Sequence, residues 1–407
     1  MRILSVAVTL VSICLCYGLP VVTWAADWSV VPAITMKGEY DSNLNFSYGE
    51  KRSDYLLHVY PVTDYNYESE ILKLTGRLAL HGMHYFANSN VDKIDQNFTV
   101  LSRYQTTPRL SLTFNGSYIV DSSLQEELTE SGLIMTRTPR QSIRVTPGLA
   151  YNLTERAMLS WNYAYYEVNY DDPDLVEYYR HSTSLSLNYL LKNEKTTLIS
   201  NIVGRITEYP DIDNQTRILG TYAGVAHKFS ENWDVSLIGG LNYTWYTYRT
   251  AVLDFTNFPF LVFVRQQEKK TFDVSPYVAL STTRRWTNTT LNMGYNRDQS
   301  SSYGGTNFER NSAYMRLIYK YSEKLSGSLG TSFYFSESSG DSGAGNDYQS
   351  LVFYISPELT YKLTEKLSVG SGYRLGWRQS QQNTTQSTNR HLVWVFLSYS
   401  YPIHYQK

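Results

Sequence analysis

Cysteine is almost absent from this sequence of 407 residues. The two that occur, Cys14 and Cys16, both lie in an apolar N-terminal segment. If that segment is removed on export, as its composition indicates below, the mature chain carries no thiol. Disulfide bonds, thiolate metal sites, thiol catalysis and covalent c-type haem are then excluded together.

Long apolar runs are also missing. After residue 19 no uninterrupted apolar stretch approaches the roughly 18 residues that a membrane-spanning helix needs. An excess of charge of one sign is missing as well, because 36 Lys and Arg stand against 37 Asp and Glu. The chain as a whole therefore shows no signal for nucleic-acid binding, and no nucleic-acid partner is expected.

The N-terminal segment has the features of an export signal. Arg2 precedes an apolar run over residues 3–19, and Thr23-Trp24-Ala25 offers small residues at the usual cleavage positions. We therefore predict a cleavable signal peptide at residues 1–25 and a single domain over residues 26–407. Export through the inner membrane follows from that prediction.

Aromatic residues are abundant, with 37 Tyr, 8 Trp and an aromatic share of 15%. Tyr and Trp favour membrane interfaces, because an apolar ring and a polar tip suit the headgroup level. Many segments, such as residues 72–80 and 233–245, place apolar side chains at every second position and mostly polar side chains between them. A soluble β-sandwich also alternates, but aromatic residues at the ends of the apolar faces favour strands that cross a membrane.

The alternating segments are joined by two kinds of junction. Variants of one short polar turn recur at residues 152–156, 229–232, 321–324 and 362–366, and longer junctions lie between them. Short turns at one end and long loops at the other are typical of outer-membrane barrels. The predicted fold is all-β: a transmembrane antiparallel up-and-down β-barrel of about eighteen strands, with short periplasmic turns and long extracellular loops. Sixteen strands are the second choice, and twenty would follow if residues 251–264 form a hairpin.

A barrel of this width can enclose an aqueous passage, so the candidate functional residues are those predicted to face its lumen. Charged lumen residues tune which solutes pass, and the set leans weakly basic. In the plainer interpretation, these charged side chains only pair with one another across neighbouring strands and do not select solutes. The candidate lumen-lining residues are Lys73, Arg77, Arg103, Arg144, Arg205, Arg316, Lys320, Arg374, Tyr277, Tyr314 and Tyr354.

Two long junctions are candidates for narrowing such a passage. One covers residues 121–140, and the other, residues 247–270, is rich in phenylalanine. A run this apolar should be buried on a surface, so it either enters the lumen, extends two strands as a hairpin, or contacts a partner. The predicted strands leave no length for an N-terminal plug. The candidate constriction residues are Phe255, Phe258, Phe260 and Phe263.

No pattern in the sequence indicates catalysis, a cofactor or a metal site, so we expect a non-enzymatic protein without cofactors. The seven histidines are scattered over separate segments. His81 and His84 form one close pair, but on a strand these side chains would face opposite sides of the sheet. They should therefore not share a metal ion.

Two segments carry a resemblance to a known group. Pro32-Ala33-Ile34 leading to Gly38-Glu39-Tyr40-Asp41-Ser42-Asn43, and Val59-Tyr60-Pro61-Val62 in the next segment, resemble the β-barrel porin 2 group. That group includes barrels found beside exosortase and exopolysaccharide loci. The export signal and the barrel pattern predict a bacterial outer-membrane location, in contact with lipid and lipopolysaccharide. The resemblance adds exopolysaccharide export through that membrane with periplasmic polysaccharide-export proteins. The chain departs from many barrels by ending in Tyr405-Gln406-Lys407 instead of a terminal Phe.

The residues alone leave three functions open. A conduit for exopolysaccharide would suit lumen tyrosines, since their rings stack on sugar faces and their hydroxyls bond to sugar hydroxyls. A general diffusion porin for small solutes needs only the barrel and an inward loop. A sheath barrel around a multihaem cytochrome is permitted, although this chain has no haem-attachment motif of its own.

Overall fold

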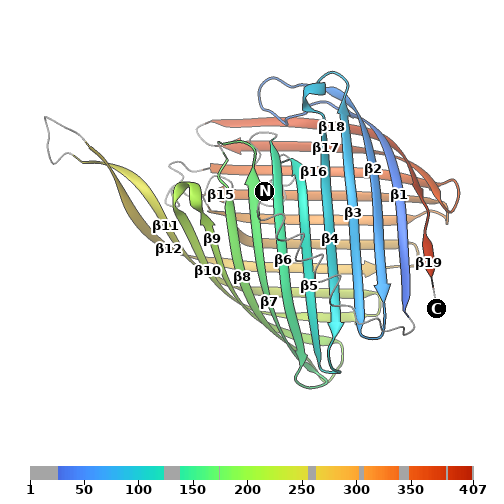
Figure 1. Cartoon of the computed structure of the whole chain (residues 1–407), viewed down its shortest axis with the longest axis horizontal. Coiled ribbons are helices and arrows are strands. Elements are labelled where there is room, and N and C mark those ends of the chain that lie inside the picture. Colours follow the sequence, from blue (N-terminus) through green and yellow to red (C-terminus); the bar gives the residue numbers. More distant parts are fainter. Residues whose placement is uncertain are drawn as a thin grey trace, which may run out of the picture.

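The computed structural model shows one antiparallel β-sheet that closes on itself (Figure 1). The structure describes residues 26–122, 138–173, 175–254, 263–301, 307–338, 348–381 and 384–405. β1 pairs with β2 on one side and with β18 on the other, so the described sheet has no free first or last strand. β19 follows Pro402, pairs with β1 and prolongs β18. The wall is therefore eighteen strands around, and the predicted barrel is confirmed.

The strand bounds follow the predicted segments to within a few residues, except at β11 and β12. The strands are β1 Asp27–Asp41, β2 Asp54–Glu68, β3 Leu72–Tyr85, β4 Lys93–Gln105, β5 Leu110–Ser122, β6 Pro139–Asn152, β7 Ala157–Tyr170, β8 Tyr178–Leu190, β9 Thr196–Tyr209, β10 Asn214–Ser230, β11 Trp233–Asp254, β12 Phe263–Arg285, β13 Thr289–Ser301, β14 Asn307–Lys320, β15 Leu325–Ser338, β16 Tyr348–Lys362, β17 Leu367–Gln381, β18 Thr385–Ser400 and β19 Ile403–Tyr405. Two 3-10 turns, η1 Ser89–Val91 and η2 Pro210–Ile212, lie in connections.

No helix in the described part of the chain is long and apolar enough to cross a membrane.

Every second side chain along a strand points away from the lumen, and these outward positions are mainly apolar. Leu237 is 47% exposed and Val395 is 61% exposed, although both lie within strands that are paired on both sides. Large apolar side chains left uncovered around a whole wall are stable only against lipid. Other members of this exposed belt are Leu78, Leu80, Ile94, Leu185, Leu187, Ile202, Leu241, Val393 and Leu397.

The recurring short turn has a common hydrogen-bond pattern. In the turn from β6 to β7, Thr154 Oγ1 accepts the N–H groups of Arg156 at 3.2 Å and Ala157 at 3.0 Å. Thr364 makes the same two bonds in the turn from β16 to β17. Ser, Thr and Asn favour turns for this reason, because their side-chain oxygens can replace a backbone acceptor. This local bond explains why similar sequences recur at one end of the barrel.

The described ends of the stretch 251–264, residues 251–254 and 263–264, prolong β11 and β12. β11 and β12 pair from Trp233–Arg284 out to Asp254–Phe263, whereas β10 pairs with β11 only as far as Thr247 in the described residues. The outer part of this hairpin therefore stands clear of its neighbours, as the left side of Figure 1 shows. The strand count stays at eighteen.

Candidate functional site

The lumen holds a cavity of about 640 Å³, called here the lumen cavity. Five strands from β1 to β5 and four from β15 to β18 line it. These nine strands are consecutive around the wall, and the closure between β1 and β18 lies among them. The cavity therefore occupies one half of the barrel.

Two ion pairs stand on the wall of the cavity at the inner face of β1 and β4. Lys37 Nζ lies 2.7 Å from a Glu39 carboxylate oxygen, and Lys93 Nζ lies 2.8 Å from Asp95. Each pair joins residues two apart on one strand, which places both side chains on the same face of the sheet. Most of the positive charge on this wall is therefore neutralised locally.

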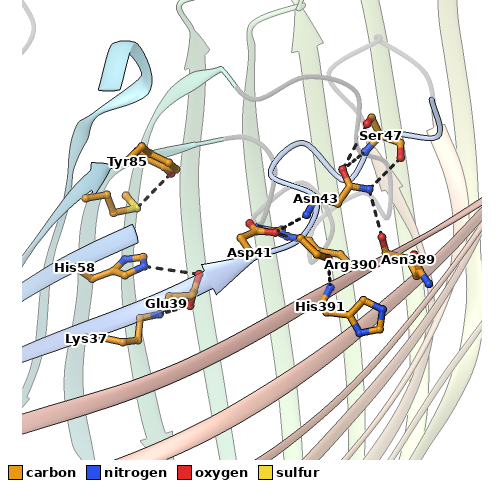
Figure 2. Close-up of polar contacts among 12 residues, drawn as sticks. Lys37, Glu39, Asp41, Asn43, Ser47, His58, Tyr85, Asn389, Arg390 and His391 are labelled. Atoms are coloured by element: carbon orange, nitrogen blue, oxygen red, sulfur yellow. Dashed lines mark hydrogen bonds and ion pairs between the residues drawn. The ribbon is translucent and has the colours of Figure 1, made fainter. Parts of the chain in front are cut away.

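Two histidines connect these ion pairs across β2 and β3. His58 Nδ1 lies 2.8 Å from His81 Nε2, so one ring donates a hydrogen bond to the other. The second ring nitrogen of each histidine faces a carboxylate. His58 Nε2 lies 3.7 Å from Glu39 Oε1 (Figure 2), and His81 Nδ1 lies 3.6 Å from Asp95 Oδ2. The Tyr60 ring stacks on His81 with 3.8 Å between the ring centroids. A continuous polar row thus crosses four strands.

This row was missed from the sequence, where the histidines looked scattered. Strand register brings them together: Lys37 lies opposite His58 on the paired strands, and His81 lies opposite Asp95. Alternation predicts only which face of the sheet a residue occupies, whereas the pairing of strands sets which residues meet. The signal in the sequence that could have found this row is the length of the turns, from which the register of paired strands can be estimated.

Aromatic rings on the inner wall lie flat over glycines of neighbouring strands. A Cβ added at Gly372 would lie 2.3 Å from the indole of Trp394, and one at Gly376 would lie 2.7 Å from the ring of Tyr354. The Trp394 ring also lies between two cations, with Lys37 Nζ at 5.8 Å and Arg374 Cζ at 5.9 Å from its centroid. Because the rings lie flat, they leave room in the lumen, and the Trp394 ring makes cation–π interactions with Lys37 and Arg374.

The connection between β1 and β2, residues 42–53, reaches over the lumen and is called here the Phe46 loop. Phe46 is 0% exposed, and it packs on Val352 and Tyr354 of β16, a strand not adjacent to β1 or β2. Its φ of 50° lies in the left-handed region, which costs a non-glycine residue about 1–2 kcal/mol. Burial of the ring compensates this cost, so the loop is held inward by packing.

The base of the Phe46 loop is fixed by polar contacts that Figure 2 shows. The Asn43 N–H donates to the Asp41 carboxylate at 2.9 Å, and the Asn43 side-chain amide donates to the Ser47 carbonyl at 3.1 Å. Asp41 also receives the guanidinium of Arg390 from β18. An inward-folded loop thus occurs at residues 42–53, a connection that was not among the two loops predicted to narrow the lumen.

Side chains narrow the other half of the lumen. Phe308 of β14 joins a buried cluster whose other members come from β7, β8, β9 and the β7–β8 connection. Nearby, Arg205 of β9 donates to the Gln299 carbonyl at 3.3 Å, and Gln299 also contacts Thr244 and Asp273. The contacts of Gln299 with Arg205 and Thr244 join β13 to β9 and β11, strands with which β13 does not pair. The members of the apolar cluster are Tyr166, Val168, Tyr170, Leu175, Tyr178, Tyr209 and Phe308.

The structure places two of the candidate lumen-lining residues, Arg374 and Tyr354, in the lumen cavity. The others lie elsewhere along the barrel. Arg77 pairs with Asp64 at 2.7 Å, Lys73 pairs with Glu68, and Arg205 lies 3.9 Å from Asp298.

Three further candidates make ring contacts. Arg144 lies 4.5 Å over the Tyr166 ring, and Tyr277 lies 4.2 Å from Tyr222. Tyr314 covers Gly294.

By register, the remaining three candidates lie opposite other residues of the inner face. Arg103 lies opposite Lys73, Arg316 opposite Gly330 and Lys320 opposite Ser326. The candidates therefore do not form one basic cluster.

The candidate constriction residues Phe255, Phe258 and Phe260 lie outside the described residues, as do the predicted signal peptide and residues 123–137. Phe263 begins β12 opposite Asp254. Of the three outcomes left open for residues 247–270, the described part adopts the extended hairpin.

His81 and His84 lie on opposite faces of β3, as expected from their spacing. His81 joins the polar row, whereas His84 Nδ1 lies 2.7 Å from Asp92 at the rim. The backbone N–H of Tyr85 and the His84 ring lower the pKa of the Asp92 carboxyl. Among the described residues no group of three potential metal-ligating side chains comes together.

The comparisons with known proteins give distant matches. A family model described as "Putative MetA-pathway of phenol degradation" matches residues 263–392, less than half of the chain. No curated protein sequence matches.

Similar solved structures include the outer membrane protein opdK from Pseudomonas aeruginosa, at 12% identity and a TM-score of 0.42, covering 92% of this chain and 99% of that one. P. aeruginosa OccK2 (OpdF) in complex with glucuronate matches at 12% identity and a TM-score of 0.42, covering 93% of this chain and 98% of that one. The ferric-catecholate import receptor Fiu from E. coli K12 matches at 8% identity and a TM-score of 0.44, covering 91% of this chain and 81% of that one.

Proposed function

We propose that this protein is a channel in a bacterial outer membrane through which small hydrophilic solutes diffuse. The observation that carries the proposal is the lumen cavity, a polar space of about 640 Å³ inside a closed wall whose outer face is apolar. Such a wall is stable in lipid, and a polar interior gives water and solutes a path across it.

The size of the solute follows from what occupies the lumen. The Phe46 loop crosses one half, and the cluster around Phe308 fills part of the other. A monosaccharide fits a space of several hundred Å³, whereas a polymer needs a continuous wide passage. A small solute therefore fits the lumen cavity, and we propose that it passes without rearrangement of the wall.

Export of exopolysaccharide with periplasmic partners, which the family resemblance implies, stays a prediction. Tyr60 and Tyr354 in the lumen cavity favour sugars as solutes, but passage of a chain requires the Phe46 loop to leave the lumen. A sheath for a multihaem cytochrome fits less well, because that partner would have to occupy the space that the Phe46 loop and the Phe308 cluster fill.

The test is liposome swelling with the purified barrel and solutes of increasing size. We expect entry of a pentose and a hexose, slow entry of a disaccharide and exclusion of a polysaccharide. Phenol belongs in the series because of the description of the matching family. No swelling with any solute would refute the channel. Loss of secreted polysaccharide in a deletion strain, together with passage of oligosaccharides, would support the export conduit.

A further inference from the structure

The charges that line the lumen cavity are balanced at all but one position. Lys37, Lys93 and Arg390 line the cavity, and Arg140 lies beside it through its partner Asp121; each of these four cations has a carboxylate within 4 Å. The pairs are Lys37–Glu39, Lys93–Asp95, Arg140–Asp121 and Arg390–Asp41.

Arg374, which also lines the cavity, has no such partner among the described residues. Its inner-face neighbour across the β17–β18 pairing is Leu392, which carries no charge. The cavity therefore has one excess positive charge at a defined place.

The surroundings of Arg374 indicate what could bind there. The guanidinium lies over the Trp394 indole, which orients it without neutralising it. The remaining lining combines flat rings, including the Tyr60 ring stacked on His81, with hydroxyl groups at Ser332 and Ser356. Rings offer a face to a carbohydrate ring, and hydroxyls offer both donors and acceptors.

We propose that the lumen cavity is a binding site for an acidic monosaccharide, a hydroxylated six-membered ring that carries one carboxylate. The Arg374 guanidinium binds the carboxylate with two parallel hydrogen bonds, which its planar fork matches. The Tyr60 ring packs against the sugar face, and the carboxylates of Glu39 and Asp95 accept hydrogen bonds from sugar hydroxyls. This inference rests on the proposed function, since the solute must be able to enter the lumen.

Other solutes match the cavity less completely. A neutral hexose leaves the charge of Arg374 uncompensated. An aromatic acid without hydroxyl groups pairs with Arg374 but leaves the dehydrated hydroxyl groups of the wall without partners, which costs about 1–3 kcal/mol for each buried group. A dianion meets Glu39, Asp95 and Asp121 at the same wall and is repelled. One carboxylate on a hydroxylated ring satisfies all of these groups.

The test is titration calorimetry of the folded barrel in detergent with galacturonate, galactose and benzoate. We expect galacturonate to bind more tightly than either other probe. Arg374→Gln should weaken galacturonate binding by about tenfold to a hundredfold, the range of a lost charged hydrogen-bond pair. Arg103→Gln removes the same charge from the lumen face away from the cavity and should leave affinity unchanged.

Arg374→Lys serves as a second variant in case the glutamine variant fails to fold. Lysine keeps the positive charge but loses the two parallel N–H donors of the guanidinium, so this variant should bind galacturonate with intermediate affinity. Equal affinity of wild type and both Arg374 variants would overturn the assignment of the carboxylate. Galactose or benzoate binding as tightly as galacturonate would overturn the ligand class.

Conductance of the same preparation separates this inference from the proposed function. A barrel that conducts ions but does not bind galacturonate refutes only the site, whereas one that binds but never conducts refutes only the channel.

Discussion

Arg390 on β18 and Asp41 on β1 form an ion pair across the closure of the barrel, with Nε 3.0 Å from Oδ1 and 3.1 Å from Oδ2 of the carboxylate. The Asp41 side chain is fully buried and also accepts the N–H of Asn43. One carboxylate thus connects the last strand, the first strand and the base of the Phe46 loop.

Removing this carboxylate should destabilise the barrel strongly. We expect Asp41→Ala to cost on the order of 3 kcal/mol, because it leaves Arg390 buried without its partner. The matched control is Asp64→Ala, whose partner Arg77 is 54% exposed; that change should cost at most about 1 kcal/mol. Denaturant unfolding of both variants measures the difference, and equal costs would show that the closure does not depend on this pair.

The facing of β11 can be tested with one charge at adjacent positions. Leu237 is on the exposed apolar face, and Ser236 lies opposite Ser281 on the inner face. Leu237→Arg should cost roughly 2–4 kcal/mol, the range for Arg at the middle of a bilayer, whereas Ser236→Arg should be tolerated in a wet lumen. Folding into lipid vesicles reports both values. A reversed order would mean that the assigned faces are exchanged.

The short turns should depend on one hydroxyl each. Thr364→Val keeps the shape of the side chain but removes the acceptor for the N–H groups of Lys366 and Leu367. We expect a loss of about 1 kcal/mol in unfolding free energy. Glu365→Gln, one residue further on in the same exposed turn, is the control. If both variants behave like wild type, the recurring Ser and Thr have another cause.

The flat position of Trp394 should depend on the glycine beneath it. Gly372→Ala places a methyl group 2.3 Å from the indole and must displace the ring, whereas the nearest atom to a Cβ at Gly330 is 3.8 Å away. We expect Gly372→Ala to shift tryptophan fluorescence and lower ion conductance as the ring moves into the lumen. Gly330→Ala should change neither property. An unaltered emission spectrum for Gly372→Ala would argue against the close approach.

Much of the fold could be predicted because a period of two is a local property. Residues 233–245 showed their inner and outer faces without knowledge of any partner strand, and Thr154 and Thr364 marked their turns through bonds only two or three residues long. The strand count followed from these local signals. The hairpin of β11 and β12 was harder, since an apolar stretch is compatible with a strand, a buried loop or a partner contact.

The site could not be predicted to the same degree, because its contacts are between residues far apart in the sequence. His58 meets His81 only through the register of β2 and β3. Phe46 is a single aromatic residue in a polar connection, and its burial depends on Val352, some three hundred residues later. The constriction was predicted at residues 247–270 because that stretch is rich in phenylalanine. The Phe46 loop is instead held in the lumen by one aromatic ring and the buried carboxylate of Asp41.

The central claim, that solutes pass through a lumen narrowed by the Phe46 loop, is tested most directly by single-channel conductance of wild type and Phe46→Gly. Glycine suits the positive φ at this position and removes the ring that anchors the loop. Phe86→Gly removes an exposed ring from the neighbouring connection and serves as the control. We predict small discrete steps for wild type and the control, and clearly larger steps for Phe46→Gly. Steps of equal size in all three proteins, or no steps in any, would contradict this account.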